Sequence, residues 1–442
     1  MSTPSSSSPS SSSPSSSSSS QVVTQVLKCD PSSITFPPSS SSSIDAQPSI
    51  TCPQTLQALQ TASHHLSLSN LVVFPTETVY GLGAPALSTP ASSKIFSTKG
   101  RPPDNPLIVH ISSLAMLNTL LPPQFTMPKT YEILIRRFWP GAMTLLFPRN
   151  EDVVPGIITA GQNTVGIRMP SHPVARALIA ISNSPLAAPS ANTSGKPSPT
   201  RAEHVLRDLD GRVGIILDGG PCGVGLESTV VDGLGEDGHL RVLRPGGITV
   251  EDLERALEEG LPGGNRDAEG KVGVRVLVHR RDYSDEKMES APTTPGMKYR
   301  HYSPSVPVVL LLTIRRSGEG EVRKVEEYLQ TLGDEYNSNS PIKSESEAGS
   351  STPSSIVKIG IMAPSHSKIW GQLPQKPGVE WVRYDLGNDS AHVAQRLFDG
   401  LLSLECGGVQ GILVEEVGEE REGLAVMNRV RKAASVCVRV EV

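Results

Sequence analysis

The chain has 442 residues, more than one hydrophobic core usually serves, so we expect two folded domains joined by linkers. Apolar residues make up 37% and aromatic residues only 4%, which indicates that part of this length stays unfolded. A formal net charge of -5 excludes a generally basic nucleic-acid coat protein but leaves room for a local basic cleft.

The five cysteines are scattered without a C-x-x-C pair, so the sequence predicts neither a zinc cage nor a disulfide framework. The N-terminus lacks an apolar signal core and the Arg-rich character of a transit peptide. No apolar run approaches the ~20 residues of a membrane helix. We therefore expect a cytoplasmic protein with no membrane segment.

The first 50 residues form a Ser/Pro-rich tract, which we predict to be disordered because it cannot bury enough apolar surface. Residues 51–262 follow as an α/β domain in which helical and strand-like patterns alternate. The expected helices cover 53–66, 91–99, 131–138, 172–181, 202–209 and 250–257. The expected strands cover 71–74, 106–111, 143–147, 164–168, 186–188, 213–217, 228–232 and 240–243. Several of the last strands are joined by loops too short for crossovers, which predicts a mixed sheet.

Residues 263–304 are rich in Gly, Pro and charge, as an interdomain linker should be. Within them, the motif 295–304 (PGMKYRHYSP) gathers cationic and tyrosine side chains, and we expect it to act as a lid over a cleft. A second, smaller, Rossmann-like α/β domain is predicted for 305–442, interrupted by a disordered insertion at 337–355.

The familiar nucleotide motifs are missing, since neither a P-loop nor a complete dinucleotide fingerprint is present. Polar and cationic residues instead follow several predicted strands and helices. Two of these segments are 74–83, with hydroxyls and glycines, and 99–106, with Lys99 and Arg101 around Gly100. Each has a plain structural alternative: a tight turn with a capping threonine, or cations that complement a helix dipole, worth ~0.3 to 1 kcal/mol.

Four further segments have the same character: 164–170, 187–198, 225–229 and 243–247. Six such loops on one domain exceed what turns alone require. Because Arg offers a planar fork for phosphate and Lys a mobile point charge, the set predicts a basic cleft that binds a polyanion.

These segments resemble blocks of the YrdC-like threonylcarbamoyl-AMP synthase family. The similar blocks are FPTETVYGLG, KGRPPDNPLIVHI, FWPGAMTLLF, TVGIRMP, APSANTSGKPSPT, LESTVVD and LRPGG. The motif PGMKYRHYSP and the unit after it resemble the long, two-domain form of the family. The resemblance implies a YrdC-like mixed twisted sheet with a basic central cleft.

The resemblance also implies the roles of individual residues. The catalytic set falls on Lys99, Arg101, Ser190 and Asn192. The threonine pocket falls on Thr78, His110, Arg168, Ala188 and Ser228. Contacts with ATP or its product fall on Arg101, Asn105, Thr164, Ser190, Asn192, Ser198, Arg244 and, in the lid, on Arg300, His301 or Tyr302.

The activity so implied is synthesis of L-threonylcarbamoyladenylate from L-threonine, bicarbonate and ATP with Mg²⁺, for threonylcarbamoyladenosine modification of tRNA position 37. The expected protein is thus a nucleotidyltransferase of tRNA processing, with no metal site made from protein motifs. Its product would pass to a tRNA threonylcarbamoyl transferase complex, and a weak contact with tRNA is consistent with the basic cleft. Two alternatives stay open: an RNA-binding module without catalysis, and a carbamoyl-adenylate step on another acceptor, as in hydrogenase-maturation proteins.

Overall fold

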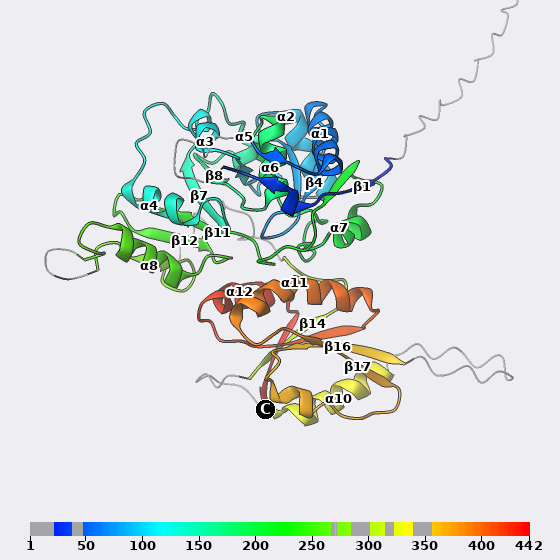
Figure 1. Cartoon of the computed structure of the whole chain (residues 1–442). Helices are drawn as coiled ribbons and strands as arrows, with labels where there is room; N and C mark the ends of the chain where they lie inside the picture. Colours follow the sequence, from blue (N-terminus) through cyan, green and yellow to red (C-terminus); the bar gives the residue numbers. More distant parts are fainter. Residues whose placement is uncertain are drawn as a thin grey trace, which may run out of the picture.

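The computed structural model describes residues 22–37, 47–266, 270, 272–283, 301–313, 322–338 and 356–442. The chain folds into two α/β units, one above the other in Figure 1. The larger unit is built on an eleven-stranded mixed sheet with the order β1-β10-β4-β5-β9-β6-β8-β7-β11-β12-β13. The predicted fold class, a mixed twisted sheet followed by a smaller α/β domain, is confirmed.

The strands of the large sheet are β1 (Gln25–Lys28), β4 (Val72–Phe74), β5 (Gly81–Pro85), β6 (Val109–His110), β7 (Met143–Pro148), β8 (Thr164–Arg168), β9 (Leu186–Ala187), β10 (Ile215–Asp218), β11 (Thr229–Asp232), β12 (Leu240–Arg244) and β13 (Val276–Val278). Its helices are α1 (Pro53–Ser67), α2 (Thr89–Lys99), α3 (Leu114–Leu120), α4 (Lys129–Phe138), α5 (Gly156–Thr159), α6 (Pro173–Ser182), α7 (Ala202–Leu209) and α8 (Val250–Gly260). A small hairpin, β2 (Ile34–Thr35) with β3 (Ser49–Ile50), flanks them.

Local sequence explains where key helices begin and end. The Ser88 hydroxyl accepts from the main-chain N–H of Ala91 and caps α2, and Gly100, with φ 61°, ends it in the left-handed conformation. A capping box between Thr249 and Asp252 begins α8. The end of α2 is therefore fixed, and with it the position of Lys99.

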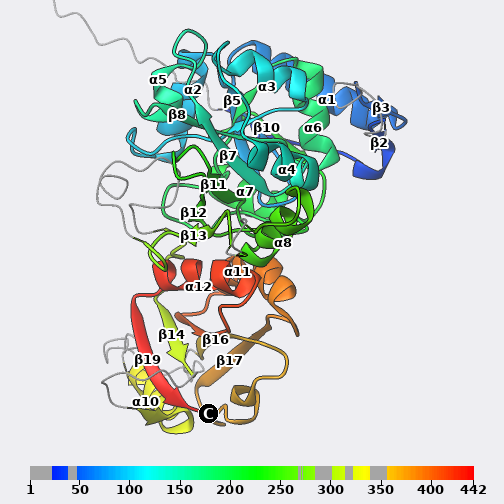
Figure 2. The same ribbon diagram turned by 90° about the vertical axis from the view of Figure 1, so that its left-hand side faces the viewer.

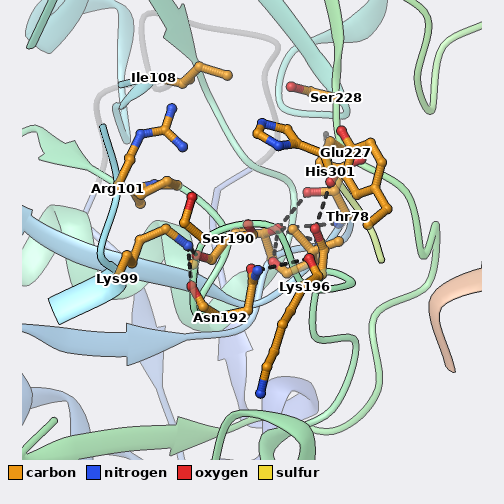
Figure 3. A pocket seen from close by; sticks show the side chains of 18 of the residues that line it. Thr78, Lys99, Arg101, Ile108, Ser190, Asn192, Lys196, Glu227, Ser228 and His301 are labelled. Carbon is orange, nitrogen blue, oxygen red and sulfur yellow. Dashed lines mark hydrogen bonds between the residues drawn. The ribbon is translucent and has the colours of Figure 1, made fainter. Parts of the chain in front are cut away.

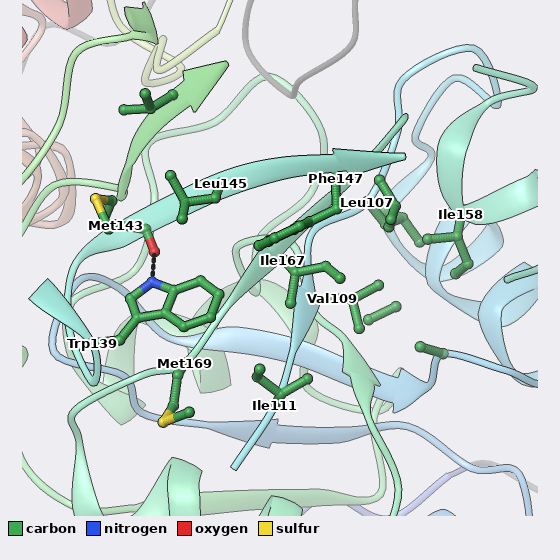
Figure 4. Close-up of a cluster of buried hydrophobic side chains, with 14 of the residues drawn as sticks. Leu107, Val109, Ile111, Trp139, Met143, Leu145, Phe147, Ile158, Ile167 and Met169 are labelled. Carbon is green, nitrogen blue, oxygen red and sulfur yellow. Dashed lines mark hydrogen bonds between the residues drawn. The ribbon is translucent and has the colours of Figure 1, made fainter. Parts of the chain in front are cut away.

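The main core lies between the sheet and its covering helices. Figure 4 shows the part around Trp139, whose indole N–H donates to the carbonyl of Met143 at 2.8 Å. Phe147 packs edge-on against Tyr131 with ring centroids 5.4 Å apart. Such aromatic pairs add to the apolar burial that holds β7 and α4 together.

The smaller unit has a six-stranded, wholly parallel sheet of order β15-β19-β14-β18-β16-β17. Its strands are β14 (Val308–Leu312), β15 (Arg323–Lys324), β16 (Val357–Ala363), β17 (Val379–Asp385), β18 (Gly411–Glu415) and β19 (Val436–Glu441), and its helices α10 (Val325–Ser338), α11 (Ser390–Cys406) and α12 (Glu422–Ala433). Both views place α11 and α12 between this sheet and the large unit, with α10 on the opposite face (Figures 1 and 2). The two helices thus form the domain interface.

Three boundaries differ from the prediction. Residues 1–50 were predicted to be disordered, which is wrong for 22–37 and 47–50: β1 pairs in parallel with β10, and Cys29 and Ile34 are buried. The predicted linker contains β13, which pairs with β12. The insertion predicted at 337–355 begins after α10, and its residues 339–355 lie outside the described ranges. None of the helices in the described part is long and apolar enough to cross a membrane.

Candidate active site

Three neighbouring strands in the middle of the large sheet bring polar side chains side by side. The register pairs His110 of β6 with Arg168 of β8, and Arg168 with Thr144 of β7. Thr144 in turn shares a hydrogen bond of 2.7 Å with Ser228, the residue before β11. All four side chains are buried. Strand pairing alone therefore gathers residues that are far apart in the sequence.

Arg168 is held by the loop that follows β4. Its guanidinium donates to the Thr78 hydroxyl at 2.9 Å and forms an ion pair with Glu77. Its Nε is buried without a partner in the described structure. Because a guanidinium has five N–H groups, donors remain for a ligand carboxylate on the side that Glu77 does not occupy.

The hydroxyls of Thr76 and Thr78 form a short chain next to Arg168. Thr76 donates to the carbonyl of Val79 at 2.7 Å, and its oxygen lies 2.7 Å from that of Thr78. The Thr76 proton is used in the first bond, so Thr78 must donate to Thr76. The Thr78 oxygen then offers only lone pairs to its other neighbours, which suits an ammonium group or another donor.

Lys99, the last residue of α2, is only 2% exposed. Its ammonium group donates to the main-chain carbonyls of Ser190 and Asn192, and Figure 3 shows it beside these residues. Burial and then the nearby Arg101 lower the pKa of Lys99 well below its ordinary value. One of three ammonium protons is left for a ligand.

Two further buried guanidinium groups lie on the same pocket as Lys99. Arg101 is 9% and Arg244 5% exposed. Arg101 donates to the carbonyls of Asn105 and Pro106, and Arg244 to that of Ser228. Burial, and then repulsion from Arg244, lower the pKa of Arg101. Cations held this close are stabilised when a polyanion binds between them.

The loop after β9, which Lys99 contacts, forms another wall of the pocket. The side-chain amide group of Asn192 donates to the carbonyls of Thr193 and Lys196, at 2.8 and 3.0 Å, and its side-chain oxygen Oδ1 is buried without a partner among the described residues. Ser198 donates to Glu227 at 2.6 Å. This wall therefore presents oxygen acceptors to the pocket.

His110 carries no charge at neutral pH. Burial, and then Arg168, lower its pKa to about 3. Its Nδ1 lies 3.2 Å from the carbonyl of Ile108, which accepts a hydrogen bond when that nitrogen carries the ring proton. Because the imidazole is neutral, the positive charge in this part of the pocket lies on the guanidinium of Arg168.

The described end of the predicted lid closes over the pocket. His301 and Tyr302 line it, and the main-chain N–H of Ser303 donates to the carbonyl of Gly195 at 2.9 Å. Tyr302 is buried, with φ 67°, and its ring centroid lies 5.2 Å from that of Phe398 in α11. The lid thus reaches the pocket from a support on the second domain.

One pocket collects most of the residues singled out in the sequence. It has about 740 Å³ of space that no atom fills, open mouth included. The sequence-derived residues that line it are Thr78, Lys99, Arg101, His110, Arg168, Ala188, Ser190, Asn192, Ser198, Ser228, Arg244, His301 and Tyr302. Their convergence confirms the predicted basic cleft, whereas their individual roles toward ligands stay predictions.

Three residues behave differently. Asn105 and Thr164 do not line the pocket, although both have buried polar atoms with no partner in the described part of the chain. Their predicted contact with ATP stays a prediction. Arg300 lies outside the described residues.

Sequence reasoning gave no role to several residues that line the pocket, among them the polar residues Thr76, Ser194, Lys196 and Glu227. Glu227 and Thr76 belong to segments that were singled out, so their position next to Ser228 and Thr78 was a usable signal. Arg429, which contacts Glu227 from α12, carried no such signal, because a basic residue on a helix is usually solvated.

The fold and the pocket define a ligand-binding α/β protein whose buried cations suit a polyanion, next to a small polar subsite around Arg168. Comparison with known proteins agrees with this class. Residues 65–246 match the family described as "Telomere recombination", and residues 248–435 match the "Threonylcarbamoyl-AMP synthase, C-terminal domain".

Relatives extend over both domains. The chain is 42% identical over 403 residues to the threonylcarbamoyl-AMP synthase of Schizosaccharomyces pombe, covering 87% of this chain and 90% of the relative. It is 39% identical to that of Pyrococcus abyssi, covering 85% and 94%. The crystal structure of P. abyssi Sua5 complexed with L-threonine superposes with a TM-score of 0.67 at 37% identity, covering 86% of this chain and 96% of that one. The chain belongs to the threonylcarbamoyl-AMP synthase family, in its long two-domain form.

Proposed function

We propose that this protein is a threonylcarbamoyl-AMP synthase, which forms L-threonylcarbamoyladenylate and pyrophosphate from L-threonine, bicarbonate and ATP. The observation that supports this most is that Lys99, Arg101 and Arg244 line one buried pocket together with Arg168. The triphosphate would lie among the first three cations, and the threonine carboxylate on the fourth. The P. abyssi relative complexed with L-threonine supports threonine as a ligand of this protein.

The chemistry needs no covalent bond to the protein. The amine of threonine captures bicarbonate with loss of water and gives a carbamate. A carbamate oxygen then attacks the α-phosphorus of ATP, the bond from that phosphorus to the bridging oxygen breaks, and pyrophosphate leaves. The protein therefore acts by placing the carbamate in line with the α-phosphate and by offsetting negative charge on the leaving group.

The subsites divide the pocket into two halves. On the threonine half, Arg168 takes the carboxylate, and the Thr78 oxygen, with lone pairs only, accepts from the amine or the hydroxyl. His110, Ala188 and Ser228 complete that wall. On the nucleotide half, Lys99 and Arg101 approach the phosphates, and Ser190, Asn192 and Ser198 hold the nucleoside side.

Mg²⁺ would enter as part of the substrate MgATP. Mg²⁺ usually keeps several waters and binds through substrate phosphates, and the pocket carboxylate Glu227 is already engaged by Ser198 and Arg429. The adenylate would pass in the cytoplasm to a tRNA threonylcarbamoyl transferase complex acting on position 37.

The two alternatives fit the site less well. An RNA-binding module needs cations that reach a nucleic-acid backbone, whereas Lys99, Arg101 and Arg244 are buried. A carbamoyl-adenylate step on another acceptor leaves the second domain without a purpose, although that domain matches the C-terminal domain of the synthases.

The test is release of pyrophosphate from ATP by the purified full chain. We expect it to need threonine and bicarbonate together, so that leaving out either returns the rate to background. Pyrophosphate release that does not depend on threonine would refute the proposal. Binding of RNA with a steep salt dependence, without turnover of ATP, would also refute it.

A further inference from the structure

Arg429, on α12 of the second domain, lies behind the wall of the catalytic pocket, in contact with Glu227. Its side chain is fully buried, at 0% exposure. Its Nε and one Nη lie 3.1 and 3.0 Å from the same carboxylate oxygen of Glu227, in the large domain. The other Nη donates to the carbonyl of Pro245, which follows Arg244. A residue of the accessory domain therefore supplies charge to a group of the pocket.

The carboxylate of Glu227 divides its oxygens between two partners. One oxygen faces Arg429, and the other accepts from the Ser198 hydroxyl at 2.6 Å. Ser198 and Glu227 line the pocket, whereas Arg429 does not. Arg429 can thus act on a bound nucleotide only through this chain of contacts.

A buried carboxylate needs such a partner. Burial alone would raise the pKa of Glu227, but Arg429, then Arg244 and the Ser198 hydrogen bond, together lower it. Ionised Glu227 is an acceptor only, so it fixes the single hydroxyl proton of Ser198 on itself. The Ser198 oxygen then faces the pocket as an acceptor, which suits a hydroxyl or amino group of the nucleoside rather than a bare phosphate oxygen.

The contacts around Arg429 also include the lid. Its guanidinium carbon lies 5.8 Å from the centroid of the Tyr302 ring, on which Phe398 of α11 packs as well. The helices that hold the second domain against the first therefore also seat Tyr302. Arg429 therefore lies at the domain interface, next to both Tyr302 of the lid and Glu227.

We propose that Arg429 is a positioning residue of the catalytic site: it keeps Glu227 ionised, and Glu227 in turn orients Ser198 as a hydrogen-bond acceptor for the nucleoside of ATP. The accessory domain is then part of the nucleotide site. This inference rests on the proposed function and adds a role for the second domain.

The test compares variants of the full chain by pyrophosphate release, with KM for ATP and for threonine determined separately. Arg429→Met keeps the apolar stem and removes the charge, and we expect it to raise KM for ATP at least tenfold while KM for threonine changes less than threefold. Arg431→Met is the matched control, because Arg431 lies on the same helix, is 41% exposed and pairs only with Glu419 among the described contacts. We expect its constants to stay within twofold of wild type.

The double variant that combines Arg429→Met with Glu227→Gln distinguishes a role of Arg429 in positioning Glu227 from a role that only holds the two domains together. Glutamine needs no counter-charge and still accepts from Ser198, so the double variant should recover most of the affinity for ATP. If Arg429→Met fails to fold, Arg429→Lys, which keeps a charge but not the fork, should show an intermediate KM for ATP.

Wild-type values for Arg429→Met or Arg429→Lys would overturn the inference. No recovery in the double variant would also overturn it, since Arg429 would then only brace the interface. Failure of the wild-type chain to release pyrophosphate would instead refute the proposed function. Binding of a non-hydrolysable ATP analogue to the same variants tests the role of Arg429 in nucleotide binding without requiring turnover. It therefore distinguishes failure of this inference from failure of the proposed function.

Discussion

Lys99 and Ser190 belong to different segments of the catalytic domain, and the ammonium group of Lys99 donates directly to the main-chain carbonyl of Ser190. The bond ties the end of α2 to the loop after β9, so the cation and the acceptor wall of the pocket keep a fixed separation. A second bond, to the carbonyl of Asn192, reinforces it. The charge that approaches the phosphates is therefore preorganised before ATP binds.

Lys99→Met should abolish most of the activity while leaving the fold. Methionine fills the same channel but donates no hydrogen bond and carries no charge, so we expect kcat/KM to fall roughly a hundred- to a thousandfold. Lys94→Met is the control, since Lys94 lies on the exposed side of the same helix. Pyrophosphate release and circular dichroism measure the two effects. Equal activity of both variants would contradict the assignment.

Arg168→Lys should weaken threonine binding in particular. Lysine keeps the charge but has a single donor nitrogen in place of the planar fork, so it loses the separate bonds to Thr78 and Glu77 that orient Arg168. We expect KM for threonine to rise roughly ten- to a hundredfold, with a much smaller change for ATP. Arg137→Lys, on the exposed side of α4, should change neither. A larger rise in KM for ATP than in KM for threonine would instead assign Arg168 to the nucleotide half of the pocket.

His110 makes the catalytic domain sensitive to acid. The folded protein holds its pKa at about 3, below the ordinary value of 6.5, because burial and Arg168 disfavour the charged form. This contribution to stability is complete above pH 6.5 and is lost as pH falls toward 3, and it amounts to roughly 5 kcal/mol at most. His110→Gln, which does not titrate, should show a shallower fall of the thermal midpoint between pH 6.5 and 4. An unchanged slope would show that His110 is not buried in its neutral form.

Gly225 sets how closely the two domains approach. It has φ 76°, and a Cβ there would lie 2.4 Å from the carbonyl oxygen of Gln395 in α11. Gly225→Ala should therefore force the domains apart, at a cost of about 1 to 3 kcal/mol. Gly223→Ala is the matched control, because its Cβ would meet nothing within 4 Å. Thermal unfolding and limited proteolysis of the interface report the difference; identical behaviour would mean that the close contact is not kept in solution.

Much of the fold was predictable because its elements carry regular signals. The helix that ends at Gly100, the strand at Thr164–Arg168 and four of the six strands of the smaller unit follow from periodicity and caps, whereas β15 and β19 were not predicted. The strand β5 was not predicted, because Gly81, Gly83 and Ala84 are typical of a loop. Its small residues are required by packing: a Cβ on Gly83 would lie 2.5 Å from the ring of Phe74.

Other features depend on tertiary contacts that a single sequence does not display. The strand β1 lies next to a Ser/Pro tract and shows no apolar alternation, and it exists through its pairing with the distant β10. The pocket residues were found through a family resemblance and their loop positions. Arg429 could not be found this way, because its burial results from docking of the second domain. Composition cannot indicate which basic residue of a helix will be desolvated.

The most direct measurement of the central claim is the mass of the nucleotide product formed from ¹³C-bicarbonate, threonine and ATP. We predict a mixed anhydride of AMP and the N-carboxylated amino acid, heavier by one mass unit than the product from unlabelled bicarbonate. Threonyl-adenylate without the labelled carbon, or no adenylate at all while ATP and threonine are bound, would contradict the account.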